Sequence, residues 1–229
     1  VANNSNVYKS TDGGDNFSSV FNPSFRHCHA INVDKSNNYI YACFGDSVLT
    51  TMNYRSVDAG ANWTNVITSN TTQQFTAVLA VDGARLYGSD RTLEGKIYRT
   101  TDDIASTLVL DTHYQNCFFL KQSDTTGWIY AGFKTDPTAV SDLRADIYIS
   151  KDLGLTWILY SSINGLTAGD GYLYGSNIVN GKLVISVESS GAFGSGVVLS
   201  ETSSPNVTYS TTQVSSSRNF TEFDNGKLL

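Results

Sequence analysis

The hydrophobic residues of this chain fall in short runs rich in Tyr, Phe, Val and Ile, and turn-forming residues separate the runs. Two stretches, 27–46 (HCHAINVDKSNNYIYACFGD) and 116–135 (NCFFLKQSDTTGWIYAGFKT), align without a gap, and each has the pattern of strand, turn and strand. Similar pairs of runs flank Asp82-Gly83 within 75–89, Asn180-Gly181 within 172–187 and Asn225-Gly226 within 219–229. Asn-Gly and Asp-Gly between β-rich runs are strong hairpin signals. The pattern therefore predicts antiparallel β-hairpins along the chain.

A polar motif recurs between these hairpins. Three copies fit Tyr-X-Ser-X-Asp-X-Gly-X-X-aromatic, namely YKSTDGGDNF at 8–17, YRSVDAGANW at 54–63 and YISKDLGLTW at 148–157. Two degraded copies, YRTTDDIAST at 98–107 and VLSETSSPNV at 198–207, lie in register with them. The hydroxyl residue stands at 10, 56, 100, 150 and 200, so the spacings are 46, 44, 50 and 50 residues. A period of this length with several short strands per unit is typical of a propeller blade.

The chemistry of the motif suits a folded turn. The carboxylate can accept hydrogen bonds from the N–H groups of its own loop and from the preceding hydroxyl, and the glycine can adopt a positive φ. The aromatic residue begins the next strand and is expected to pack back onto the hairpin. A calcium loop would need several more oxygen ligands than the motif offers, so we reject that alternative. The residues assigned to this structural role are Ser10, Asp12, Gly14, Phe17, Ser56, Asp58, Gly60, Trp63, Ser150, Asp152, Gly154 and Trp157.

The three full copies resemble the Asp-box repeat, also called the bacterial neuraminidase (BNR) repeat, of sialidase-like and sortilin-like propellers. The resemblance implies an all-β fold of about five four-stranded antiparallel blades that form one domain over residues 1–229. Each blade is expected to run from an inner strand A through B and C to the box turn and an outer strand D. The boxes lie near 10–17, 56–63, 100–107, 150–157 and 200–207. In this family the box turn lies on the face opposite the ligand pocket, so the box carboxylates are predicted to be structural.

The two ends of the chain suggest how such a ring would close. Joined end to start, NGKLL and VANNSNVYKST parallel NGKLVISVESSGAFGSGVVLSET at 180–202. The C-terminal residues are therefore expected to supply strand A and part of strand B of a blade that the N-terminal residues complete. Such closure removes exposed sheet edges. The sequence leaves open whether the five blades make a complete ring or belong to a longer propeller.

Composition and charge exclude several classes of function. The chain has 229 residues, a net charge of −6, a sequence pI near 4.9 and only 16% charged residues. No basic cluster reaches the density that phosphate backbones require, and no apolar run approaches the ~18 residues of a membrane span, so we expect neither nucleic-acid binding nor membrane insertion. The low charge and the abundance of Ser, Thr and Asn favour an extracellular, cell-surface or virion-surface protein. The disulfide state of Cys28 and Cys43, on paired strands of one hairpin, stays open.

Ligands of such rings usually bind at the connections from strand D to strand A and from B to C. The longest such connection, 135–146, is interpreted as a solvated insertion. The residues predicted to bind a ligand are Phe25, Arg26, Gln73, Gln74, His113, Tyr114, Asn116 and Arg218, together with Gln115. No cofactor and no metal are expected, because His27 and His29 lack a convincing third ligand.

The function favoured by the sequence is a non-catalytic recognition or structural module that binds a glycan or a protein, with homotypic assembly as a further hypothesis. The alternative is a sialidase-like glycoside hydrolase with carboxylates at the channel mouth. For this hydrolase alternative, Arg26 and Arg218 are expected to begin neighbouring inner strands, and Glu222 is the best candidate for a catalytic carboxylate. Because fold constrains function only loosely, the choice depends on the geometry of the site.

Overall fold

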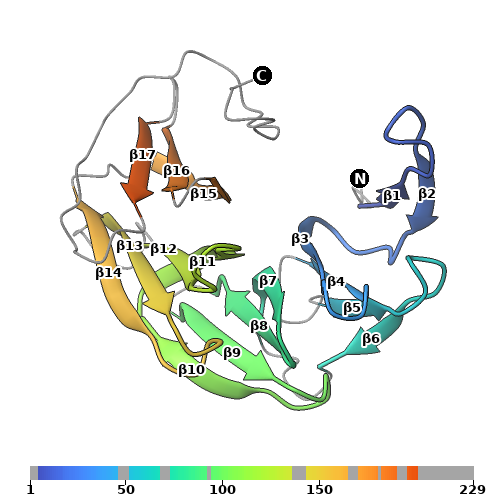
Figure 1. Cartoon of the computed structure of the whole chain (residues 1–229), viewed down its shortest axis with the longest axis horizontal. Helices are drawn as coiled ribbons and strands as arrows, with labels where there is room; N and C mark the ends of the chain where they lie inside the picture. The colour runs from blue at the N-terminus through green and yellow to red at the C-terminus, as the bar shows by residue number, and fades with distance from the viewer. Residues whose placement is uncertain are drawn as a thin grey trace. The chain divides into compact units, whose positions relative to one another are not determined.

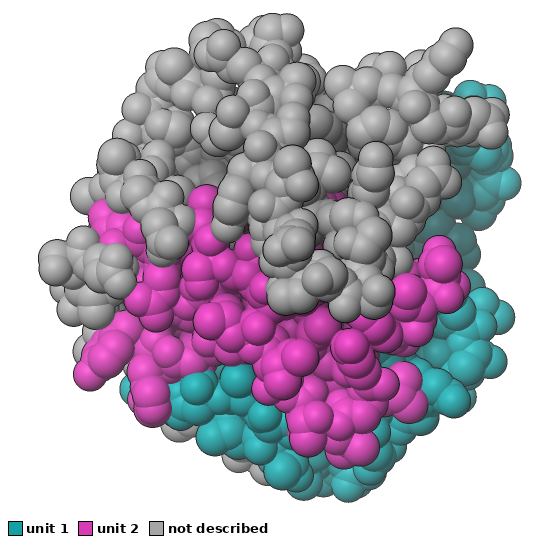
Figure 2. Space-filling view, turned by 60° about the vertical axis from the view of Figure 1, so that its left-hand side comes forward, with its two compact units in different colours: residues 1–91, 96–111 teal, residues 92–95, 112–229 magenta. Residues whose placement is uncertain are grey.

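The computed structural model describes residues 5–45, 52–67, 73–91, 94–135, 143–164, 170–179, 182–189 and 195–200. All of its regular elements are β-strands, which form five antiparallel sheets within these residues (Figure 1). The described segments contain no helix that is long and apolar enough to cross a membrane. The chain divides into two compact units, 1–91 with 96–111 (unit 1) and 92–95 with 112–229 (unit 2), which Figure 2 colours separately.

Unit 1 contains a strand pair and two four-stranded sheets. The pair consists of β1 (Val7–Lys9) and β2 (Ser18–Phe21). The first sheet is β3 (Cys28–Val33), β4 (Ile40–Phe44), β5 (Met52–Ser56) and β6 (Thr64–Val66). The second sheet is β7 (Phe75–Val81), β8 (Ala84–Ser89), β9 (Lys96–Thr100) and β10 (Thr107–Asp111).

Unit 2 contains a four-stranded and a three-stranded sheet. The third sheet is β11 (Gln115–Gln122), β12 (Ile129–Thr135), β13 (Arg144–Ser150) and β14 (Ile158–Asn164). The fourth is β15 (Asp170–Val179), β16 (Lys182–Ser189) and β17 (Ser195–Ser200). The predicted order of strands A to D is confirmed in the three four-stranded sheets. In each of them the third strand ends at the motif hydroxyl, which is Ser56, Thr100 or Ser150.

The predicted hairpins are confirmed where the structure describes them. The gapless alignment places Cys28 opposite Phe44 and Cys117 opposite Phe133 in the same register. All three four-stranded sheets also share a bulge on their inner strand, directly after the pair formed by Cys28, Phe75 or Cys117. Gly83 turns the hairpin of β7 and β8 with φ of 67°. The expected hairpin of residues 219–229 and most of the fifth motif lie outside the described residues.

Each unit has its own apolar core. In unit 1, Tyr41, Cys43, Phe75 and Tyr87 pack between the first and second sheets. In the same unit, the β1–β2 pair packs on the first sheet through contacts that include Phe21 with Phe44 of β4 and a stacked Phe21 and Trp63. In unit 2, a cluster of Phe119, Tyr130, Ala145, Ile147, Ile149, Leu183 and Ile185 joins the third and fourth sheets. This face-to-face packing of sheets is what the alternation of apolar and polar residues requires.

The three full motif copies fold into the same hydrogen-bonded turn. The first hydroxyl, Ser10, donates to Asp12 Oδ1 at 2.7 Å and accepts the N–H of Gly14 at 2.8 Å. The corresponding contacts of the second copy measure 2.9 and 2.8 Å, and those of the third measure 2.8 and 2.9 Å. The prediction that hydroxyl, carboxylate and glycine are used within the turn itself is confirmed.

Two consecutive residues of each turn have positive φ. The first position holds Gly13, Ala59 or Leu153, with φ of 78°, 56° and 58°. The second holds the motif glycines, with φ of 105°, 90° and 82°. Values near 60° lie in the left-handed region that side chains can enter at some cost, whereas values near 90° favour glycine. This difference explains why only the second glycine recurs in all three copies.

A further donor in the turn escaped the sequence pattern. The residue just before the aromatic is Asn16, Asn62 or Thr156, and its side chain donates to the second carboxylate oxygen. The aromatic residue of the motif does not make the same contact in all three copies. The indole N–H of Trp63 donates to Gly60 O at 3.0 Å, and that of Trp157 donates to Gly154 O at 3.3 Å. Phe17 has no ring N–H and is 64% exposed, so its expected packing onto the hairpin does not occur.

These hydrogen bonds predict how the turns respond to acid. They lower the pKa of Asp12, Asp58 and Asp152 from 3.8 to about 2, and the donor before the aromatic contributes most in each case. A folded pKa below the unfolded one gives stability that is complete above about pH 4 and is lost as the pH falls toward 2. We expect the carboxylate carbon resonances of the three residues to titrate with midpoints near 2. Midpoints near 3.8 would contradict the hydrogen bonding described above.

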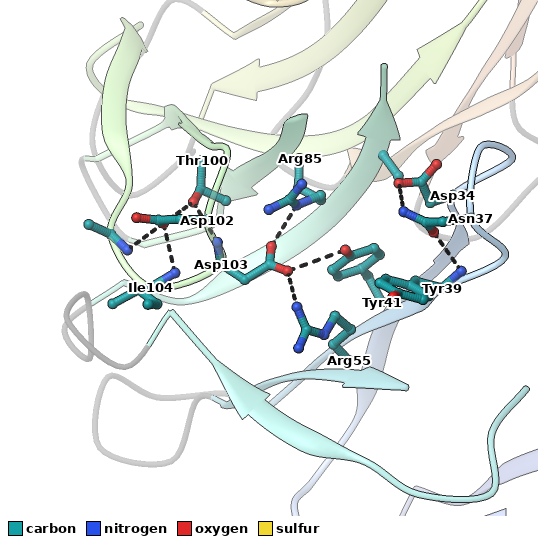
Figure 3. Close-up of polar contacts among 12 residues, drawn as sticks. Asp34, Asn37, Tyr39, Tyr41, Arg55, Arg85, Thr100, Asp102, Asp103 and Ile104 are labelled. Atoms are coloured by element: carbon teal, nitrogen blue, oxygen red, sulfur yellow. Dashed lines mark hydrogen bonds and ion pairs between the residues drawn. The ribbon is translucent and has the colours of Figure 1, made fainter. Parts of the chain in front are cut away.

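The degraded copy at 100–107 has become a connection between the first and second sheets. Ile104 replaces the second glycine, and the preceding Asp103, with φ of 63°, turns its carboxylate into the protein (Figure 3). That carboxylate is paired with Arg85 through Oδ1 and with Arg55 through Oδ2, the latter at 2.7 Å. The hydroxyl of Tyr41 donates to Oδ2 at 3.3 Å, and the carbonyl oxygen of Asp103 accepts the N–H of Ile67 at 2.8 Å. The contacts join strands β4, β5 and β8 and the end of β6.

Candidate functional site

The connection that leads into the third sheet, residues 112–116, has a strained backbone. His113 and Tyr114 are consecutive and both adopt the left-handed region, with φ of 45° and 50°. Residues with a side chain rarely enter this region, and two in succession are kept there only when the surroundings hold them. Tyr114 is 49% exposed. The connection therefore presents an aromatic side chain on a fixed backbone.

Gly95 holds one end of this connection. Its carbonyl oxygen accepts two hydrogen bonds from Thr112, from the backbone N–H at 2.9 Å and from Oγ1 at 2.8 Å. A Cβ atom at Gly95 would overlap the carbonyl oxygen of Gln115, so only glycine allows this approach of the two backbones. No feature of the sequence pattern indicated this role of Gly95.

A buried carboxylate holds the other end. Asp146 on β13 is 1% exposed and accepts three hydrogen bonds from its own sheet. They come from Gln115 Nε2 at 2.6 Å, Arg144 Nε at 2.9 Å and Ser162 Oγ at 2.6 Å. Because both oxygens are engaged, this carboxylate serves as a structural anchor for the start of β11 and offers no free oxygen for acid–base chemistry.

Two amide oxygens beside Tyr114 have no hydrogen-bond partner among the described residues. Gln115 is 2% exposed, and its Oε1 accepts no hydrogen bond although its Nε2 donates to Asp146. Oδ1 of Asn116, on the other face of β11, is also buried and unpaired. Buried acceptors without a donor are uncommon and are usually satisfied by water or a ligand. The connection thus combines an exposed aromatic ring with two buried acceptors that bound water can satisfy.

The other predicted ligand-binding residues belong to unit 1 or lie outside the described residues. Phe25 packs against the core beside the β1–β2 pair, and the carbonyl oxygen of Arg26 accepts the N–H of Gly45 at 2.8 Å. Gln73 is 9% exposed with an unpaired Oε1, and the carbonyl oxygen of Gln74 accepts the N–H of Asp90 at 2.9 Å. Of the predicted residues, His113, Tyr114 and Asn116 lie close together because they belong to one short segment of the chain. Arg218 lies outside the described residues.

The remaining chemical candidates are two histidines, two cysteines and Glu222. His27 and His29 face each other with ring centroids 5.8 Å apart, and within the described ranges no group of three His, Cys, Asp or Glu could hold a metal ion. Cys28 and Cys43 are free thiols, and burial raises the pKa of Cys28 to about 11. Glu222, on which the glycoside hydrolase hypothesis depends, lies outside the described residues, so that hypothesis stays a prediction.

The fold has counterparts among solved structures. No family model matches the chain, and no curated protein matches it. A GH74 enzyme of Niastella koreensis superposes with a TM-score of 0.52 and 16% identity over 76% of this chain and 28% of that chain. A nidogen/laminin complex superposes with a TM-score of 0.60 and 9% identity over 85% of this chain and 67% of that chain. YCF48 bound to D1 peptide superposes with a TM-score of 0.50 and 14% identity over 84% of this chain and 57% of that chain.

These similarities establish the fold and nothing more. The GH74 enzyme and YCF48 are β-propeller proteins, so the prediction of a β-propeller made of four-stranded antiparallel sheets is confirmed. The chain spans 28% of the GH74 enzyme and 57% of the YCF48 chain. Identities this low do not carry an activity from one protein to another.

Proposed function

We propose that the chain is a non-catalytic recognition module that binds a protein segment at the connection of residues 112–116. The observation that carries the proposal is the exposed Tyr114 on a strained backbone, held by Gly95 on one side and by the Asp146 cluster on the other. Strain that the surroundings maintain is typical of ligand-binding positions. A rigid tyrosine offers contact area at low entropic cost and is a common anchor of protein interfaces.

A protein ligand fits the site better than a reacting substrate. The half-exposed Tyr114 offers a polypeptide an aromatic contact surface. The carboxylate of Asp146 already has three donors, which leaves it unsuited to protonate or attack a substrate. Two of the similar folds were solved with protein or peptide partners, namely the nidogen/laminin complex and YCF48 with D1 peptide.

The finer assignments made from the sequence belong to the same proposal. The three identical turns support membership of the Asp-box repeat superfamily. We propose five blades and a location outside the cytosol, on a cell surface, a secreted assembly or a virion. The low charge of the chain and its abundance of Ser, Thr and Asn support this location.

The proposal is tested with a library of random peptides displayed on phage. We expect selection against the whole chain to enrich peptides whose binding to Tyr114→Ala is weaker by about tenfold or more, as for loss of an aromatic anchor. Tyr8→Ala is the matched control, since Tyr8 is a tyrosine of similar exposure, 57%, in unit 1. Equal loss of binding in both variants, or none in either, would show that Tyr114 does not form the site. A glycan array is screened in parallel. Binding to glycans but to no peptide would show that the ligand is a glycan and not a protein.

A further inference from the structure

The outer strand of the third sheet, β14, is a long edge strand. It spans seven residues, whereas the outer strands β2, β6 and β10 span four, three and five. It pairs with β13 on one side and with no other strand of the described residues. Figure 1 shows β14 at one edge of this sheet. The backbone N–H and C=O groups along its other side can therefore accept a further strand.

The start of β14 carries exposed apolar side chains. Ile158 is 58% exposed and Leu159 is 54% exposed, and successive residues of a strand point to opposite faces of the sheet. Leu155, in the turn that leads into the strand, is 56% exposed. Leu108 of β10 occupies the same register position as Leu159, because each lies opposite a tyrosine of the third strand, but the residue before it is Thr107. Exposed apolar side chains gathered along an unpaired edge are typical of an interaction site.

The outer strands of the other two four-stranded sheets are better protected against pairing. β6 has only three residues, and the N–H of Ile67 directly after it donates to the carbonyl oxygen of Asp103 at 2.8 Å. β10 ends at Asp111, whose carboxylate pairs with Lys96 at 3.9 Å. Short length, covered backbone groups and charged residues all prevent an edge strand from pairing with another chain. Among these three outer strands, β14 has none of these protections.

The charge pattern of this segment suits a second copy of the chain as its partner. Residues 153–164 contain no Asp, Glu, Lys, Arg or Pro, although the net charge of the chain is −6. In an antiparallel pair with two-fold symmetry, each strand lies opposite its own sequence, so a charged residue would bring its like close to it. An uncharged apolar strand avoids this repulsion. The segment is thus compatible with its own copy.

We propose that two copies of this chain associate through their β14 strands, which pair antiparallel about a two-fold axis. The pairing joins two four-stranded sheets into one continuous sheet and buries part of the exposed surface of Ile158 and Leu159. β11 and β14 form opposite edges of the third sheet, so Tyr114, which precedes β11, stays at the edge away from the partner. If the proposed function holds, such a dimer presents two Tyr114 connections and binds a ligand with repeated segments more tightly than a single copy does.

The first experiment measures the mass of the whole chain by sedimentation equilibrium over about a hundredfold range of concentration. We expect the mass to rise from 24.9 kDa toward twice that value. Leu159→Lys should raise the dissociation constant about tenfold or more, because a charged residue on an edge strand opposes its pairing. Leu108→Lys is the matched control, since Leu108 is 45% exposed at the equivalent position of β10. A chain that stays monomeric, or equal weakening by both variants, would overturn the proposal.

The second experiment shows whether the backbone of β14 makes the contact. Amide hydrogen exchange of the unsubstituted chain is compared at concentrations where the monomer and the dimer predominate. Amides of β14 that do not bond to β13 should exchange about tenfold or more slowly in the dimer, because the pairing must open before they exchange. Amides of β10 are the internal control and should exchange equally in both. A dimer without added protection in β14 would assign the association to another surface and overturn the proposal.

Discussion

Replacing Asp103 by Ala is expected to lower the free energy of unfolding by about 3 kcal/mol or more, the cost of breaking a buried ion pair on one side. The side chain of Asp103 is 5% exposed and neutralises Arg85, which is 9% exposed, as well as Arg55. Its loss leaves two guanidinium groups without a counter-ion between the first and second sheets. Urea unfolding followed by tryptophan fluorescence measures the change.

Asp102 provides the matched control. It is the adjacent residue, lies in the same turn, is exposed and accepts N–H groups of Ile104 and Ala105 at 2.9 and 3.1 Å. Asp102→Ala should cost much less than Asp103→Ala, because it removes only exposed hydrogen bonds within the turn. Asp103→Asn keeps the shape of the side chain but removes its charge. We expect its loss of unfolding free energy to be closer to that of Asp103→Ala than to that of Asp102→Ala. If Asp102→Ala and Asp103→Ala were equally destabilising, the carboxylate would not connect the sheets.

The second large effect is expected for Gly95→Ala. The added methyl group would overlap the carbonyl oxygen of Gln115, so the two backbone segments must separate. Overpacking of this kind costs about 1–3 kcal/mol, and here it also removes the hydrogen bonds of Thr112 to Gly95. Calorimetry measures the stability, and the peptides selected on the whole chain measure whether Tyr114 is still presented.

Gly13→Ala is the control for this substitution. Gly13 has φ of 78° with no atom within 4 Å of an added Cβ, and Ala59 occupies the same turn position at φ of 56°. We therefore expect a cost of about 1 kcal/mol, the lower end of the range for placing a side chain in the left-handed region. If Gly95→Ala behaves like Gly13→Ala and peptide binding survives, the close approach of the two backbones has no role in presenting Tyr114.

The repeat made most of the architecture predictable. The Ser-X-Asp-X-Gly spacing predicted turns whose hydrogen bonds are local, and local hydrogen bonds depend little on distant residues. It missed the donor at Asn16, Asn62 and Thr156 because Asn and Thr differ in type although both offer a hydrogen atom at the same place. The alignment of 27–46 with 116–135 predicted the register correctly, since both hairpins share length and pattern.

The contacts between distant segments were not predictable in the same way. Asp103 was assigned to a degraded motif, and its partners Arg55 and Arg85 come from other strands, 48 and 18 residues away. The sequence indicated Tyr114 and its neighbours as ligand-binding residues from their place in a connection. It could not indicate the positive φ of His113 and Tyr114, because nothing in two ordinary side chains marks a left-handed backbone.

The buried thiols provide a separate report on each unit. Cys43 of unit 1 and Cys117 of unit 2 are both 0% exposed, and burial raises the pKa of Cys43 well above its usual range. Neither can react with an alkylating reagent until its own surroundings open, so each labelling rate measures the opening equilibrium of one half of the chain. A single common rate means one cooperative block, whereas two rates rank the halves by local stability. The cysteines thus make the cooperativity of the chain measurable without any introduced cysteine.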